Sequence, residues 1–123
     1  MAYEGPPLPQ MTLLRGSTPY SAFRIIGADL TGYKVVCYVR HVGDEEPVFS
    51  INGNVTSTGT TADGVNYSIV KVKFTQKKTL LLKAGRPCEL QMRYISSGGY
   101  ADGTRPIRVN VVDTLKDGEM TYA

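Results

Sequence analysis

The sequence contains no tryptophan and only one histidine, His41, among its 123 residues. Serine and cysteine hydrolases use a histidine to accept the nucleophile's proton, so any such site would have to include His41. No GxSxG motif is present, and Cys37, on the same face of the same expected strand, would lie roughly 13 Å from His41 by strand rise. We therefore interpret His41 as a surface histidine and expect no enzymatic activity and no catalytic residue.

Long apolar runs are also missing. No stretch approaches the roughly 20 residues that a membrane-spanning helix needs. The opening segment, MAYEGPPLPQMTLL, has no basic region followed by an apolar one and so does not resemble a secretory signal. We expect a protein that is made in the cytoplasm and has no membrane partner.

Charge of one sign is not in large excess, because 14 basic residues face 11 acidic ones and the net charge is +3. Proteins that bind nucleic acid usually gather lysine and arginine in one patch, whereas here these residues are spread along the whole sequence. We interpret them as solvated strand faces and turns. The expected partners therefore include no nucleic acid and no small-molecule substrate, and no cofactor is implied.

Acidic residues cluster once, at Asp44, Glu45 and Glu46 on an expected turn. A calcium site needs oxygen ligands at regular spacing around a loop, and this cluster lacks that spacing. We expect no metal.

The two cysteines, Cys37 and Cys88, are too few for a disulfide scaffold. Both fall at inward positions of strong expected strands, about 50 residues apart. That layout is similar to the inter-sheet disulfide of immunoglobulin domains, so a bridge is one alternative. Because no secretory signal is seen, we favour two buried thiols that act as small apolar side chains.

Alternation of apolar and polar residues is the strongest signal that the sequence does carry. A period of two is typical of half-buried strands. It is clearest at residues 33–41, 67–74 and 88–95. Weaker patterns predict further strands at residues 11–15, 19–26, 48–51 and 104–112.

The segments between these strands carry turn signals. Residues 54–65 are rich in threonine, serine and glycine and predict a hairpin loop or a ragged edge strand. Residues 75–82 predict one helical turn with Thr75 as its N-cap, after which three leucines would close the end of the domain. Residues 96–103 predict a loop with two glycine breaks.

About seven to eight short antiparallel strands without a strong amphipathic helix predict an all-β, immunoglobulin-like β-sandwich. The missing tryptophan separates it from antibody-type domains, which bury one. We divide the chain into an extended N-terminal arm at residues 1–10, a β-sandwich domain at 11–113 and a C-terminal tail at 114–123.

Several short motifs occur in a recognisable order. RGSTP at residues 15–19 begins an early strand, and ADLTGY at 28–33 precedes the first strong one. FTQKKTL at 74–80 follows the second, and residues 85–94 open the third. This order resembles a family of small β-sandwich domains in tailed phages and prophages, best known as the N-terminal domain of upper baseplate proteins. The family's first motif has an aspartate where this chain has Ser17.

The resemblance covers residues 12 to 112 and implies a virion structural protein. Such a protein would be a baseplate, tail or fibre-attachment adaptor subunit that assembles in the bacterial cytoplasm. Its partners would be copies of itself and other virion proteins, and the family supplies no catalytic residue. The alternative is a bacterial carbohydrate- or protein-binding β-sandwich module, in which Tyr38, Tyr67 and Tyr100 would be the exposed aromatic residues.

An assembling subunit makes its contacts through arms, loops and sheet edges, which offer unpaired backbone groups to a neighbour. We therefore expect contacts from the N-terminal arm and from the loops at 52–65 and 96–103. Tyrosine is favoured at interfaces because it combines a large area with a polar tip. The candidate interface residues are Tyr3, Pro7, Leu8, Asn54, Asp63, Tyr100 and Tyr122.

Overall fold

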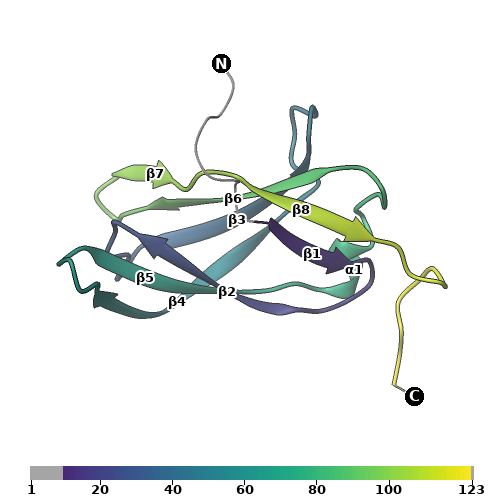
Figure 1. Ribbon diagram of the computed structural model, residues 1–123, viewed down its shortest axis with the longest axis horizontal. Coiled ribbons are helices and arrows are strands. Elements are labelled where there is room, and N and C mark those ends of the chain that lie inside the picture. The colour runs from purple at the N-terminus through teal and green to yellow at the C-terminus, as the bar shows by residue number, and fades with distance from the viewer. Residues whose placement is uncertain (1–9, 123) are drawn as a thin grey trace.

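The computed structural model describes residues 10–122, in which eight strands and one short helix form the regular structure (Figure 1). The expected N-terminal arm, with Tyr3, Pro7 and Leu8, lies outside the described residues apart from Gln10, which begins β1. The elements are β1 Gln10–Leu14, β2 Tyr20–Ile26, β3 Lys34–His41, β4 Phe49–Thr60, β5 Asn66–Lys73, α1 Gln76–Thr79, β6 Cys88–Ile95, β7 Ala101–Gly103 and β8 Ile107–Val112.

The strands form one curled sheet in the order β1-β8-β6-β3-β4-β5-β2, with β7 paired to β6. The all-β prediction is confirmed, but the expectation of antiparallel strands is wrong for β1, which runs parallel to β8 with Leu14 opposite Val112. Alternation predicts a strand without giving its direction. A turn at Gly16, with φ of 82°, leads from β1 to β2 at the other end of the sheet order, so β1 is not half of a hairpin.

The curl arises in β4, whose two halves pair with different partners. Residues 49–53 pair with β3, and residues from Asn54 onward pair with β5, with a register shift between Val55 and Ser57. At the changeover stands Gly53, where a Cβ atom would lie 2.7 Å from Cγ1 of Val70. Glycine therefore allows β4 and the Val70 side chain to approach this closely.

Of the two alternatives predicted for residues 54–65, the hairpin loop is wrong for residues 54–60, which belong to β4, whereas the ragged edge strand agrees with their pairing to β5 alone and with the register shift between Val55 and Ser57. Threonine, serine and glycine gave too little apolar alternation to decide between the two alternatives. The turn at Asp63-Gly64 is confirmed, and Gly64 has the positive φ of 81° that glycine adopts without strain.

The core is built from the inward residues of alternate strand positions. On β5, the fully buried Val70 and Val72 alternate with Lys71 and Lys73, and β3 and β6 show the same pattern. Phe74 follows β5 and packs edge-on against Phe49, with ring centroids 6.3 Å apart. The largest fully buried side chains include Phe74, Leu13, Leu30, Leu82, Met92 and Val35.

Cys37 and Cys88 are both free and buried, as predicted. They lie on neighbouring strands, where Cys37 is opposite Met92 and Cys88 is opposite His41. Four strand positions, roughly 13 Å, therefore separate them along the sheet, which is too far for a disulfide. The comparison with an inter-sheet bridge does not hold, and desolvation raises the pKa of Cys37 to about 12.

The helical turn predicted near residue 75 is confirmed as α1. The Thr75 side chain accepts a hydrogen bond from the Lys78 backbone N–H at 3.2 Å, which satisfies one of the unpaired donors at the helix start. Of the three leucines that follow, Leu82 is buried, whereas Leu81 is exposed. The expected closure of the core at this end therefore depends on Leu82 and not on Leu81.

Candidate interaction surface

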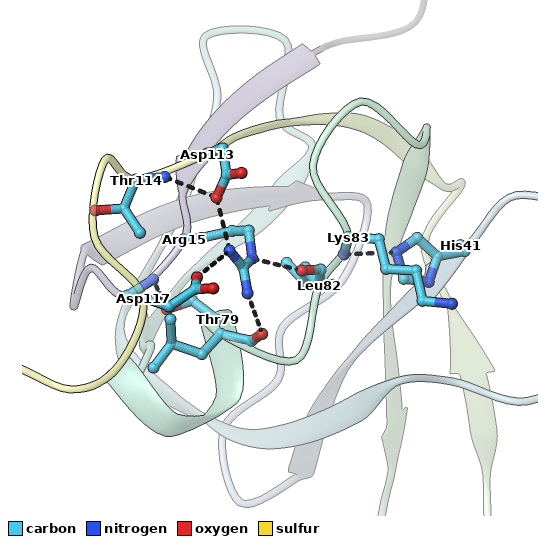
Figure 2. A network of polar contacts seen from close by, with 10 residues as sticks. Arg15, His41, Thr79, Leu82, Lys83, Asp113, Thr114 and Asp117 are labelled. Carbon is cyan, nitrogen blue, oxygen red and sulfur yellow. Dashed lines mark hydrogen bonds and ion pairs between the residues drawn. The ribbon is translucent and has the colours of Figure 1, made fainter.

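Arg15, the first residue of the RGSTP motif, is the centre of a polar network just after β1 (Figure 2). Its Nε donates to the Leu82 carbonyl at 2.8 Å and its Nη2 to the Leu80 carbonyl at 3.0 Å. Its Nη1 donates to Asp113 at 2.6 Å and to Asp117 at 3.0 Å. All three guanidinium nitrogens are thus engaged, and the side chain is only 17% exposed.

Arg15 and Asp113 of this network each favour the charged form of the other. The hydrogen bonds that Arg15 donates to Asp113 and Asp117 raise the pKa of Arg15. The bond from Arg15, followed by one from the Thr114 backbone N–H, holds the pKa of Asp113 below its usual value. Arg15 therefore joins the segment after α1 to the segment after β8 by charge-assisted bonds, which are stronger than neutral ones.

Thr79, the last residue of α1, connects α1 to the two residues that follow Arg15. Its buried hydroxyl accepts from the Gly16 N–H at 3.0 Å and lies 3.0 Å from the Ser17 carbonyl, to which it donates. A Cβ atom on Gly16 would meet Leu80 at 3.4 Å, in addition to the strain of the positive φ. The RGSTP motif thus connects β1 to the α1 region through hydrogen bonds of Arg15, Gly16 and Ser17.

The C-terminal segment, residues 113–122, has no helix or strand, yet it is attached to the domain at two places. Arg15 holds its first part. Farther along, Gln76 donates from Nε2 to the Met120 carbonyl at 3.0 Å and accepts from the Met120 N–H at 2.6 Å. Figure 1 shows this segment leaving the end of β8 on the side of α1 and β1, and a hollow of about 750 Å³ separates it from the β1–β2 turn.

Large apolar side chains are exposed along this attached segment. The exposed fractions of Leu115, Met120 and Tyr122 are 108%, 81% and 109%. Leu14 and Val112, opposite each other on β1 and β8, and Leu81, beside the carbonyls that bind Arg15, are about half exposed. We call these residues the Arg15-end surface: Leu14, Leu81, Val112, Leu115, Met120 and Tyr122.

The other predicted interface residues that fall within residues 10–122 are not brought to this surface. Asn54 is exposed on β4, Asp63 lies in the β4–β5 turn, and Tyr100 precedes β7 and donates to Asp102 at 3.3 Å. The β4–β5 turn and the β6–β7 loop lie at the opposite end of the molecule from the C-terminal segment (Figure 1). Among the described residues of the predicted set, Tyr122 alone belongs to the Arg15-end surface, while Leu115 and Met120 were missed in a segment without periodicity.

His41 is buried, with 3% of its side chain exposed, so its interpretation as a surface histidine is wrong. Its Nε2 accepts a hydrogen bond from the Lys83 backbone N–H at 3.1 Å, as Figure 2 shows. Its Nδ1 lies 3.9 Å from Asp44, which in turn accepts from Arg86 at 2.6 Å. The alternation that turns Cys37 and Val39 inward extends to position 41, and the bond from Lys83 satisfies the imidazole there.

We expect stability to fall as the pH is lowered through the range in which this histidine titrates. Desolvation, and then the charge of Arg86, lowers the pKa of His41 in the folded protein. The unfolded chain has the ordinary value of about 6.5 and therefore binds the proton first as the pH falls. The melting temperature should decrease from pH 7.5 toward pH 5.5, before the carboxylates titrate.

His41→Gln is the matched variant, because its amide oxygen can still accept from Lys83 but cannot titrate. Its melting temperature should be lower than that of the wild type at pH 7.5 but nearly constant down to pH 5.5. Equal slopes for the two proteins over this range would show that His41 is not the group responsible.

Among residues 10–122, no three histidine, cysteine, aspartate or glutamate side chains lie close enough together to hold a metal ion. The same residues form no helix long and apolar enough to cross a membrane. No known family model matches the chain, and a search of curated proteins finds no match to it.

Proposed function

We propose that this protein is a structural subunit of a tailed-phage virion, a baseplate, tail or fibre-attachment adaptor, that works by contact with copies of itself and with other virion proteins. The observation that carries the proposal is the C-terminal segment, which is held in place and yet exposes Leu115, Met120 and Tyr122. Several large apolar side chains exposed on one short, attached segment favour a role in protein–protein contact.

The anchoring favours binding because a preordered segment loses less conformational entropy when it meets a partner. Arg15 and Gln76 supply that order at two points of the segment. Leucine, methionine and tyrosine side chains then offer the large contact areas that interface cores use. The phage assignment rests on the resemblance that the RGSTP motif and the motifs after it carry. Arg15 of the same motif makes the anchoring contacts.

We also propose that the curled sheet is an immunoglobulin-like sandwich that places the Arg15-end surface at one of its ends. Its strand order supports this. In immunoglobulin domains the third, sixth and seventh strands, C, F and G, form one sheet, and B and E are neighbours in the other. Here β3, β6 and β8 are neighbours and β2 lies beside β5, with β4 passing from one group to the other.

Light scattering after size-exclusion chromatography tests the proposal. The wild-type protein should have a mass of two or more times the 13.4 kDa of one chain, and the mean mass should rise with increasing concentration. Leu115→Ser with Met120→Ser should shift this equilibrium to the monomer without a change in melting temperature, because both side chains are exposed.

The matched control is Val65→Ser with Ile95→Ser, two exposed apolar residues in the β4–β5 turn and at the end of β6, next to the β6–β7 loop. This variant should assemble as the wild type does. A wild-type protein that stays monomeric at every concentration, or equal losses of assembly in both variants, would contradict the proposed role of the C-terminal segment.

A further inference from the structure

Positive charge is concentrated in the middle of the sequence. Between residues 47 and 88 the sequence has six basic residues and a single acidic one, Asp63. Strands β4 and β5 both come from this stretch, and neither they nor β2 contain an aspartate or glutamate. These three strands are neighbours in the sheet (Figure 1), so this part of the molecule presents positive charge without compensating carboxylates on its strands.

The basic side chains of β2 and β5 share the outer face of these strands. On β5 the buried Ser68, Val70 and Val72 point inward, so Lys71 and Lys73 lie on the opposite face. On β2 the buried Ile25 places Arg24 on that same outer face. The register supports this, since Tyr20 is opposite Lys73 and Arg24 is opposite Ile69.

Two tyrosine rings lie among these cations. The Arg24 guanidinium stacks over the Tyr67 ring at 4.2 Å, and the Lys71 ammonium lies 5.5 Å from the centre of the Tyr20 ring. The end of Tyr67 lies over Gly59 of β4, in the space that a Cβ atom would need. Tyr20 is 58% exposed. We call this set the β2–β5 face: Tyr20, Arg24, Tyr67, Lys71 and Lys73.

We propose that the β2–β5 face binds single-stranded nucleic acid. Cations that follow the phosphates, with aromatic rings and arginine planes on which bases stack, are the shared chemistry of proteins that bind single strands without sequence preference. Lys71 and Lys73 lie roughly 6.6 Å apart along β5, comparable with the separation of successive phosphates in an extended strand. An acidic peptide would use the cations of this face but not its rings.

The proposal departs from the sequence-based expectation of no nucleic-acid partner, and the structure supplies the reason. In the sequence, Arg24 stands far from Lys71 and Lys73, and the basic residues look dispersed. Pairing of β2 with β5 brings these three residues to one face. Whatever the C-terminal segment binds, this face lies on different strands and is tested separately.

Fluorescence anisotropy with a labelled oligothymidylate of about 15 nucleotides tests the proposal. The oligonucleotide should bind the wild-type protein at low salt. If Arg24, Lys71 and Lys73 each neutralise one phosphate, log K should fall with log salt at a slope of about −2. Lys71→Glu with Lys73→Glu should weaken binding about 10-fold or more, and Tyr20→Ala about 5-fold or more through loss of stacking.

The matched control is Lys34→Glu with Lys116→Glu, which changes the net charge equally at exposed positions on β3 and on the C-terminal segment. It should bind nearly as the wild type does, and the melting temperature of each variant checks its fold. No binding at low salt, or an equal loss in the control, would overturn the proposal. Equal binding of duplex DNA would do so too, as would polyglutamate binding that does not depend on Tyr20, which would indicate an acidic protein partner.

Discussion

Replacement of Arg15 by methionine is expected to lower the free energy of unfolding by about 2–4 kcal/mol. Methionine fills part of the space but cannot donate to the Leu80 and Leu82 carbonyls, which Arg15 binds at 3.0 and 2.8 Å. A buried carbonyl that loses its donor costs about 1–3 kcal/mol. Urea denaturation monitored by circular dichroism would measure the loss.

Arg108→Met is the matched control for this variant, because Arg108 is exposed on β8. Surface substitutions of this kind usually change stability by less than about 0.5 kcal/mol. If Arg15→Met were as stable as Arg108→Met, the network around Arg15 would not contribute to the stability of the fold.

Two variants of the same network distinguish its effect on the stability of the fold from its effect on the position of the C-terminal segment. Asp113→Asn with Asp117→Asn removes only the exposed ion pairs, which contribute little to stability in most proteins. We expect this variant to unfold almost as the wild type does, but to be cleaved faster by protease within residues 113–122. Arg15→Met should show both the lower stability and the faster cleavage.

Phe74→Ala is expected to destabilise the protein by about 3–5 kcal/mol, the usual loss for an aromatic residue removed from a core. Phe74 is fully buried, and its ring meets Phe49 edge-on at 6.3 Å. The space left behind lies between strands that belong to different parts of the curled sheet, so neighbouring side chains can fill it only in part. Thermal and urea unfolding would measure the change.

Phe74→Leu keeps most of the apolar volume and is the control for this substitution. It should cost less than about 1.5 kcal/mol, as volume-conserving swaps usually do. A loss as small for alanine as for leucine would show that the core collapses around position 74, and it would contradict the close packing described for this region.

The strands that alternation predicted were found because burial on one face leaves a local pattern in the sequence. β3, β5 and β6 are of this kind, and so is the inward position of Cys37. The same pattern pointed inward at His41, but the polar identity of that residue outweighed it in the interpretation. A buried histidine needs a partner, and Lys83, 42 residues away, is not apparent in a local pattern.

Features that depend on distant residues were not predictable in this way. Residues 54–60 are mostly exposed, and Val55 is their one apolar side chain that packs against the core, so no apolar alternation marks that half of β4. The direction of β1 depends on its pairing with β8. The Arg15-end surface depends on bonds that join residues near both ends of the described chain, and a tail without periodicity gave no sign that it would be held.

The Arg15 network also sets the order in which a newly made chain can complete its fold. Arg15 and Asp113 are 98 residues apart, and a ribosome adds about 5–20 residues per second, so Arg15 waits about 5–20 s for that partner. Until β8 emerges, β1 has no strand with which to pair, and Leu13 cannot be fully buried. When one messenger carries several ribosomes, we expect that a finished β8 can pair with the waiting β1 of the next chain, so that two copies of the chain exchange strands.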